Sequence, residues 1–425
     1  TKYPPGQSLV LTPGELLGLP WLTEPCLAAA LILATYYWVR EAFGERQALL
    51  AAALLAASPF VWCTAGTRMP FAPTACFLVC ALAFAARAER SGGSWAYAAC
   101  GAALGMAGLI RPYDALLFAL PMGTWLGLAA VRARNPRILG VVLGLAPAAC
   151  VLLWFNLRTM GTPFRMGYWH AKDFSIGFFT HPLPGFDYIH TPFQAIGNLS
   201  VAVLRLDTWL LAWPCSLLLV AAGLALGPKT IWDRRICVLL AVFTLGYSAI
   251  ASSGTWDVGP TYYFVLAPLL IALAVRGTRA LRSLPPEGSA LRRFFGLLPL
   301  VGLAVGAITL VPLHLIRLGA LTAQIEAPWR AIAQADPGDC IVILPSAVKL
   351  HAAGYSLGYP YEVRTRHGVA HLIRPVTTSE ASEARQYLGS ALPLYALNID
   401  AQRWSQGRER RYTLQPLQSP GSELP

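Results

Sequence analysis

Charged residues are scarce in this sequence. Only 13% of its 425 residues are Asp, Glu, Lys or Arg, 56% are hydrophobic, and the mean hydropathy is +0.51. Soluble domains have about 25% charged residues, so the composition excludes a soluble protein and indicates an integral membrane protein. The net charge of +12 is spread between apolar segments and not over a soluble face. We therefore expect no nucleic-acid partner.

Metal-ligand patterns are missing as well. The nine cysteines form no CxxC pair, and no His/Cys cluster has the spacing of a metal site. Eight of them lie in or beside apolar segments, and Cys340 alone lies in the more polar C-terminal part. We expect no disulfide framework and no cysteine metal site, with the thiols acting as small buried hydrophobic groups.

Long apolar segments are plentiful. A membrane-spanning helix takes about 17–25 residues, and about ten segments satisfy this, which predicts an all-α polytopic membrane domain over residues 1–316. The segments centre on Pro25–Val39, Leu49–Cys63, Ala72–Ala86, Trp95–Ile110, Asp114–Val131, Ile138–Phe155, Thr208–Leu226, Ile236–Ser252, Tyr262–Val275 and Phe294–Leu315.

The basic residues alternate between the loops of this domain. If the loop after Val39 is cytoplasmic, the cytoplasmic loops carry 15 of the 22 Lys and Arg residues before residue 317. Positive charge gathers on cytoplasmic loops, which sets the orientation. The segment Ser8–Leu22 is apolar but short and contains Pro13. We expect it to lie in the outer interface, which places Lys2 at headgroup level on the non-cytoplasmic side.

Two larger regions fall on the same side. The loop 156–207 is rich in aromatic residues, which favours an ordered interfacial loop. Residues 317–425 are more polar and predict a small extracytoplasmic α/β domain, with a helix over Ala320–Ala335 followed by a turn. Its strand candidates are Cys340–Leu344, Tyr361–Thr365, Ala370–Ile373, Pro393–Leu397 and Arg411–Leu414.

Several runs, taken in order, carry a family resemblance. They are KYPPGQSLVL, WVREAFGERQALLAAALLAASPF, LIRPYDALLFALP, FNLRTMGTPFRMGY, LLAWPCSLL and GPTYYFVLAPLL. Together they resemble GT-C glycosyltransferases that use polyprenyl-phosphate sugars, such as protein O-mannosyltransferases and lipid A aminoarabinose transferases. The resemblance covers most of residues 2–277 and extends only loosely to the tail.

The resemblance implies a reaction and a location. Such enzymes transfer a sugar from a polyprenyl phosphate to a hydroxyl group of a lipid, glycan or protein, here in a bacterial inner membrane and on its extracytoplasmic face. A carboxylate must take the proton of the attacking hydroxyl, and cations must stabilise the departing phosphate. In the family the base is an Asp that precedes the Lys-Pro-Pro region. We therefore expect the base, and one more span, upstream of Thr1, and assign no catalytic residue here.

Lys2 is the first candidate for binding the donor phosphate, because it matches the family's basic residue before the Pro-Pro pair. Pro4 and Pro5 would fix the backbone beside it, and Gly6 would permit close approach. A lysine that snorkels to the interface is the structural alternative.

Arg68 and Arg111 are two further candidates for the donor phosphate. Arg68 stands where many relatives have an acidic residue that helps to bind metal, so a divalent metal cofactor stays possible but no metal ligand is assigned. Arg68 is open to a second interpretation as an interfacial arginine. Arg111 is one turn from Asp114, and for this residue we favour a buried structural ion pair, although charges inside membranes are functional candidates.

Four residues are candidates for substrate contact. His170 lies in the long loop, where surface decoration is the favoured alternative. Asp257 precedes the segment that reads GPRYYFE in relatives, but Thr261 and Val265 replace the charged residues of that segment. Tyr262 and Tyr263 would either face the donor sugar or anchor the chain in the aromatic belt, and we favour the anchor.

Two other classes of function stay open. A transporter or lipid flippase would show inverted repeats or polar groups at the bilayer midplane; the sequence has no internal repeat, and its polar residues gather on one face. A catalytically inactive scaffold with the same fold is the second alternative.

Overall fold

A computed structural model of the chain describes residues 3–167, 176–179, 189–256, 259–343, 362–373, 392–399 and 412–416. The chain divides into two compact units, Thr1–Pro312 and Leu313–Pro425. Lys2, His170 and Asp257 lie outside the described residues.

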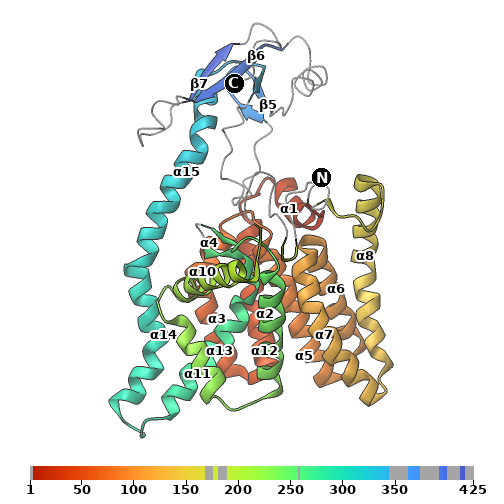
Figure 1. The fold of residues 1–425 in the computed structure, drawn as a ribbon, viewed down its shortest axis with the longest axis vertical. Coiled ribbons are helices and arrows are strands. Elements are labelled where there is room, and N and C mark those ends of the chain that lie inside the picture. Colours follow the sequence, from red (N-terminus) through yellow and green to blue (C-terminus); the bar gives the residue numbers. More distant parts are fainter. Residues whose placement is uncertain are drawn as a thin grey trace. The chain divides into compact units, whose positions relative to one another are not determined.

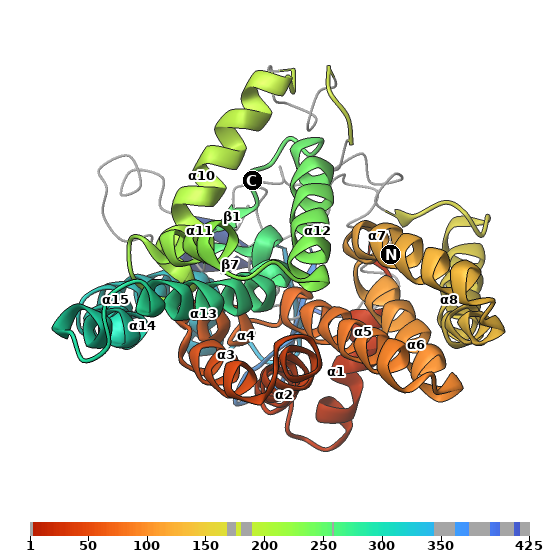
Figure 2. The same cartoon turned by 90° about the horizontal axis from the view of Figure 1, so that it is seen from below.

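The first unit is a bundle of helices (Figures 1 and 2). The helices are α1 (Gly6–Leu16), α2 (Thr23–Phe43), α3 (Glu45–Ala57), α4 (Pro59–Ala65), α5 (Phe71–Ser91), α6 (Ser94–Ile110), α7 (Pro112–Ala133), α8 (Leu139–Met160), α10 (Pro192–Leu210), α11 (Ser216–Leu226), α12 (Ile231–Ser248), α13 (Ala267–Ser283) and α14 (Ala290–Ile308), with 3-10 turns η1 (Pro136–Ile138) and η2 (Thr261–Leu266) and a two-stranded ribbon of β1 (Thr255–Trp256) and β2 (Gly259–Pro260).

Six helical segments of the described chain are long and apolar enough to cross a membrane, or seven if the bent pair α3–α4 is counted as one. They include α2, α5 and α7, and they establish an integral membrane protein. Each of the roughly ten predicted segments contains helix, but α6 and α11 are shorter apolar helices. The 57° bend between α3 and α4 lies at Ser58, directly before Pro59, and proline is the ordinary cause of such a kink.

One expectation about the middle of the chain was wrong, and the structure adds detail to a second. Thr208–Leu226 is not one helix, because α10 ends at Leu210 and α11 begins at Ser216, with positive φ at Ala212 and Cys215 between them. The loop 156–207 is also partly helical: α8 continues to Met160 and α10 begins at Pro192. A capping box of Thr191 and Gln194 starts α10 and satisfies backbone donors there.

Small residues allow the tightest helix contacts. A Cβ atom at Gly144 of α8 would lie 1.9 Å from the carbonyl oxygen of Ala98 in α6, and one at Gly277 of α13 would lie 1.8 Å from that of Leu219 in α11. Close backbone approach through glycine is the usual way in which membrane helices associate.

The cysteines differ in their exposure. Cys76 and Cys100 are buried, whereas Cys26, Cys150 and Cys237 are exposed on helix surfaces. The expectation that the thiols are buried therefore fails for those three.

The bundle has two ends with different polar chemistry. Helices α5 and α12 each run from one end to the other. The basic end is defined by Arg40, Glu41, Arg87 and Arg90, together with Arg234, Arg235 and Arg276. The site end is defined by the turn Tyr3–Gly6 and by Arg111, Asp114, Tyr247 and Tyr262.

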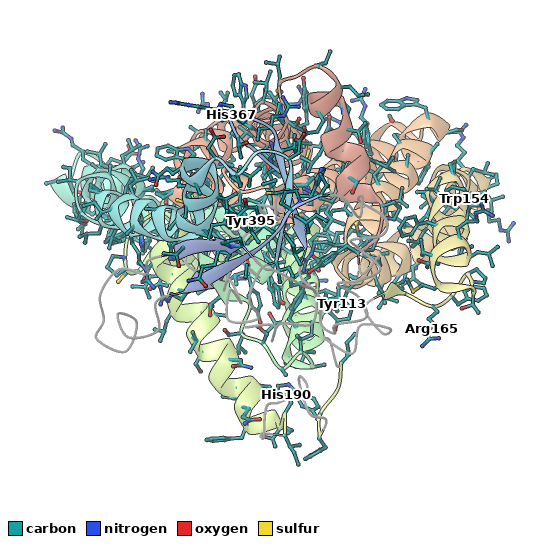
Figure 3. The ribbon with its side chains drawn as sticks, turned by 90° about the horizontal axis from the view of Figure 1, so that it is seen from above. Tyr113, Trp154, Arg165, His190, His367 and Tyr395 are labelled. Atoms are coloured by element: carbon teal, nitrogen blue, oxygen red, sulfur yellow. The ribbon has the colours of Figure 1, made fainter. Side chains whose placement is uncertain are left out.

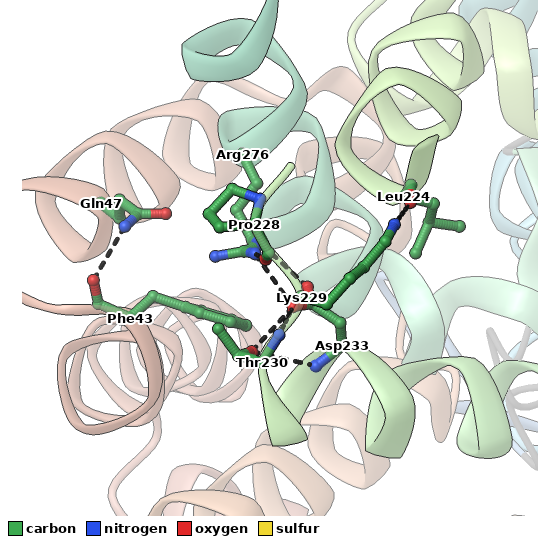
Figure 4. Close-up of polar contacts among 8 residues, drawn as sticks. All are labelled: Phe43, Gln47, Leu224, Pro228, Lys229, Thr230, Asp233 and Arg276. Carbon is green, nitrogen blue, oxygen red and sulfur yellow. Dashed lines mark hydrogen bonds and ion pairs between the residues drawn. The ribbon is translucent and has the colours of Figure 1, made fainter. Parts of the chain in front are cut away.

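Ion pairs join neighbouring helices at the basic end. Arg235 of α12 forms a bidentate pair with Glu89 of α5, with nitrogen–oxygen distances of 2.6 and 2.7 Å. Arg276 of α13 is almost fully buried, and its Nε lies 2.9 Å from Oδ1 of Asp233 in α12. Figure 4 shows this pair with Thr230, whose backbone N–H and hydroxyl both donate to Asp233. These contacts hold α5, α12 and α13 together.

The second unit contains a five-stranded sheet. Its strands are β3 (Cys340–Ile343), β4 (Glu362–Arg364), β5 (Val369–Ile373), β6 (Leu394–Ile399) and β7 (Tyr412–Pro416), in the order β4-β5-β3-β6-β7. The central strand β3 is parallel to β5 and β6, and the outer pairs are antiparallel. All four residues of β3 are buried, as a strand with parallel neighbours requires.

Helix α15 (Leu310–Ala335) precedes this sheet, and its residue Ile332 packs on it together with Trp329. The predicted helix over Ala320–Ala335 and all five predicted strands are therefore present. The predicted turn follows α15, with positive φ at Asp336 and Gly338. Burial raises the pKa of the Cys340 thiol to about 11, so this residue remains an uncharged part of the core.

Candidate functional site

Arg111 occupies the junction between α6 and α7. It is the C-cap of α6 and the N-cap of α7, with φ −138° and ψ 87°, and Pro112 follows it. A residue before proline is driven out of the helical region, whereas proline itself suits the first position of a helix. The sequence Arg-Pro therefore ends one helix, begins the next, and places the arginine at the end of the bundle.

The guanidinium group of Arg111 is held along one edge. Its Nε donates to Asp114 Oδ2 at 2.6 Å, and its Nη2 donates to the hydroxyl of Tyr247 at 2.7 Å. The Tyr247 hydroxyl in turn donates to Asp114 Oδ1. Asp114 is fully buried, whereas the Arg111 side chain is 15% exposed. The ion pair expected from the spacing is present, and Tyr247 joins it from α12.

Aromatic rings cover a face of the same guanidinium group. Its Cζ lies 4.4 Å from the centre of the Phe71 ring and 5.6 Å from that of Tyr262. Such cation–π contacts favour a charged group over a ring face. The Tyr247 ring adjoins Tyr262 at 5.2 Å. Arg111 is therefore fixed by an acidic edge and an aromatic face.

Tyr113 ties the two helices of this network together. Its hydroxyl donates to the carbonyl oxygen of Gly246 at 2.6 Å, and its ring meets Tyr247 edge to face at 5.5 Å (labelled in Figure 3). These contacts place the C-terminal end of α12 against the first turn of α7. The hydroxyl of Tyr247 is positioned at Arg111 as a result.

The Tyr3–Gly6 turn packs directly beside this group. A Cβ atom at Gly6 would lie 2.4 Å from the carbonyl carbon of Leu109 and 2.6 Å from the backbone nitrogen of Ile110. Only glycine permits this approach, and Leu109 and Ile110 immediately precede Arg111. The structure thus brings together two motifs that are about a hundred residues apart in sequence. Lys2, the residue before this turn, lies outside the described residues.

Arg68 is held by α1 at the same end of the bundle. Its Nη1 lies 3.1 Å from Glu15 Oε1, and its backbone carbonyl accepts from Gln7 Nε2 at 3.1 Å. Gln7 also donates to the buried Glu24 at 3.2 Å. Arg68 therefore forms an ion pair with α1, a partner that the sequence did not indicate.

The two tyrosines of η2 lie inside the bundle. Tyr263 is 7% exposed and packs against Phe243 and Tyr247, so the interpretation as an aromatic-belt anchor is wrong for this residue. Tyr262 is partly buried over Gly254, where a Cβ atom would lie 2.1 Å from its ring. Of the two tyrosines, Tyr262 adjoins Arg111, whose Cζ lies 5.6 Å from the centre of its ring.

Tyr247 and Phe71 are the members of this group that the sequence did not single out. Tyr247 is 136 residues from Arg111, and in the sequence it is one aromatic residue near the end of an apolar helix. No spacing rule connects positions so far apart. Among the described residues no group of three or more His, Cys, Asp or Glu side chains could hold a metal ion.

Comparison with known proteins supports the sequence resemblance. Residues 22–154 match the family model described as dolichyl-phosphate-mannose-protein mannosyltransferase. No curated protein matches the chain. The crystal structure of ArnT from Cupriavidus metallidurans bound to undecaprenyl phosphate is similar with a TM-score of 0.57 and 15% identity, covering 99% of this chain and 89% of that one.

The apo state of the same ArnT gives a TM-score of 0.56 with 14% identity, over the same shares of the two chains. The predicted resemblance to GT-C glycosyltransferases is thus confirmed, and the chain has an ArnT-like fold.

Proposed function

We propose that this protein is a membrane glycosyltransferase that moves a sugar from a polyprenyl-phosphate donor to a hydroxyl group of a lipid, glycan or protein. The observation that carries the proposal is the arrangement at the site end, where Arg111 is fixed beside the Tyr3–Gly6 turn. The fold supports it, because a protein of the same fold has been crystallised with undecaprenyl phosphate.

The reaction explains why a fixed cation belongs there. The bond between the sugar's anomeric carbon and the phosphate oxygen breaks while the acceptor oxygen bonds to that carbon, and the acceptor proton passes to a base. The leaving phosphate gains negative charge as the bond breaks. A cation already oriented toward it stabilises the transition state without reorganisation, and a guanidinium group is well suited to phosphate oxygens. We propose this role for Arg111.

Other candidates take supporting roles in this proposal. Lys2 precedes the turn that packs on α6, and we propose that it binds the same phosphate together with Arg68. Tyr262 adjoins Arg111 and would contact the sugar that the phosphate carries, with His170 and Asp257 as further substrate contacts.

We propose none of the acidic residues described at the site end as the base that accepts the proton of the acceptor hydroxyl. Asp114 and Glu15 are paired with arginines, and Glu24 accepts from Gln7.

Orientation follows from charge. The predicted cytoplasmic loops, to which the basic end belongs, carry 15 of the 22 Lys and Arg residues before residue 317, and such an excess of positive charge faces the cytoplasm. We therefore propose that the site end, and with it the reaction, is extracytoplasmic, and that the C-terminal domain, residues 317–425, lies on that side of a bacterial inner membrane.

The test is an assay of the purified full-length protein with polyprenyl-phosphate-linked sugars, in which release of free polyprenyl phosphate is measured. We expect release by the wild type, a strong decrease in Lys2→Ala, and no change in Lys229→Ala, which removes a lysine from the basic end. Failure of every donor, combined with lipid movement across vesicles, would favour a flippase. Undiminished release by Lys2→Ala would remove Lys2 from the phosphate site.

A further inference from the structure

The basic end holds an unbalanced cluster of arginines. Glu41 lies in the last turn of α2, and its side chain is 5% exposed. Three guanidinium groups surround it: Arg90 Nη1 at 2.9 Å, Arg87 Nη1 at 3.5 Å and Arg40 Nη2 at 3.5 Å. We propose that these arginines bind the phosphate of an anionic phospholipid headgroup. This site is separate from the proposed transfer reaction and does not depend on it.

The charge balance distinguishes this cluster from its neighbours. Arg235 and Arg276 each have one carboxylate, Glu89 and Asp233 respectively, so those pairs are balanced. Around Glu41 three cations share one carboxylate. The C-terminal ends of α2 and α5 contribute about half a negative charge each, which leaves about one positive charge uncompensated. An anion from outside the chain would balance it.

The arginines of this cluster are accessible to such an anion. The Arg87 and Arg90 side chains are 48% and 70% exposed, whereas the carboxylate that holds them is buried. A buried carboxylate thus orients exposed guanidinium groups. Arginines with this freedom form bidentate hydrogen bonds with phosphate oxygens.

The surface beside the cluster indicates a lipid as the source of the phosphate. Arg40 lies over the ring of Tyr37, with Cζ 5.0 Å from the ring centre. Tyr37 is half exposed, and Leu33, one turn earlier on the same face of α2, is also exposed. Tyrosines mark the level of the headgroups. A phosphate at the arginines therefore has an exposed apolar strip below it, along which an acyl chain can lie.

The experiment measures lipid binding by the full-length protein in neutral detergent. Phosphatidylglycerol, phosphatidylcholine or inorganic phosphate is titrated, and the thermal unfolding midpoint is followed by tryptophan fluorescence. The test variant is Arg87→Gln/Arg90→Gln. The matched control is Arg132→Gln/Arg293→Gln, which removes the same charge from other exposed arginines of the predicted cytoplasmic loops. Arg87→Lys/Arg90→Lys keeps the charge.

Wild type and control are expected to be stabilised by phosphatidylglycerol and not by phosphatidylcholine. Because a basic residue near an anionic lipid surface contributes about fivefold in affinity, the Gln variant should need at least roughly tenfold more phosphatidylglycerol, while the Lys variant should retain most of the response. Inorganic phosphate should have no effect; equal stabilisation by it would overturn the assignment to lipid. An unchanged response in the Gln variant, or an equal loss in the control, would overturn the site.

Discussion

The two ends of the helical bundle use arginine in different ways. At the basic end Arg276 is buried, lies over the Phe43 ring with Cζ 4.5 Å from its centre, and pairs with Asp233, which also caps α12. At the site end Arg111 likewise pairs with a carboxylate, that of Asp114, and lies over an aromatic ring, that of Phe71, but it remains partly exposed. It also adjoins a turn from a distant segment. The first arrangement joins helices, whereas the second presents a cation.

An ion pair in a membrane domain is therefore not evidence of function by itself. Both pairs involve a buried carboxylate and a cation–π contact. The two pairs differ in position: Arg276 is enclosed by the bundle, whereas Arg111 lies at its surface beside the Tyr3–Gly6 turn. Substitutions that separate stability from activity can test the distinction.

Asp233→Ala should have the largest effect, and the effect should be on stability. The substitution leaves the buried Arg276 without its carboxylate and removes the Asp233 half of the capping box that starts α12, while Thr230 remains as its N-cap. Breaking a buried pair in this way costs about 3–5 kcal/mol. Chemical unfolding in detergent measures it, with Glu287→Ala as the control: its pair with Arg292 is exposed and should contribute less than about 1 kcal/mol. Equal stability of the two variants would contradict a structural role for the basic end.

Arg111→Gln should have the largest effect on activity. Glutamine can still donate to Asp114 but carries no charge, so the leaving phosphate loses a stabilising cation. The buried Asp114 loses its cation as well but keeps the Tyr247 hydroxyl as a donor, and unfolding in detergent is measured to show that the variant is folded. Removal of one such donor lowers kcat by about 10²- to 10³-fold. Release of polyprenyl phosphate is the measurement, and Arg132→Gln, at the exposed end of α7, is the control. If the two variants were equally active, Arg111 would be a structural residue like Arg276.

Gly6→Ala tests whether the Tyr3–Gly6 turn must touch α6. The added Cβ atom would meet backbone at 2.4 Å, which a rotamer change cannot relieve, so α1 and the turn should move. A displacement of about 1 Å at a reacting group can lower the rate by up to about 10²-fold. The control is Gly123→Ala in α7, where the Cβ atom meets nothing within 4 Å. It should leave activity intact and stabilise the helix by up to about 1 kcal/mol. Wild-type activity in both variants would show that the close approach is unimportant.

The parts of the fold that are local in sequence could be predicted. Apolar runs identified helix in every expected span, and alternating or buried short runs identified the strands of the C-terminal unit. The Arg111–Asp114 pair was also predictable, because residues three apart on a helix face each other. The breaks were harder: Ala212 and Cys215 adopt positive φ within an apolar run, and hydrophobicity alone does not register a change of backbone conformation.

The candidate site was predictable only in pieces. The sequence indicates its turn and its arginine separately, but their contact depends on α1 folding back on the end of α6 through Gly6. The sequence also indicates Arg68 as a candidate cation, but its partner Glu15 lies 53 residues away. Tertiary packing determines such contacts, and one sequence contains no spacing that reveals them.

Tyr247→Phe should have the smallest effect and addresses the residue that the sequence missed. The change removes the hydroxyl that joins Arg111 to Asp114 but keeps the ring that packs against Phe243 and Tyr262. A hydrogen bond to a charged group contributes about 1.5–3 kcal/mol, and since Asp114 still holds Arg111, only part of this, roughly tenfold in kcat, should be lost. The control is Tyr263→Phe in the same cluster, whose unfolding should be nearly unchanged, whereas Tyr247→Phe should also lose about 1 kcal/mol of unfolding free energy with its hydrogen bond. A loss of stability without loss of rate would make Tyr247 a packing residue, and the site end would then resemble the basic end.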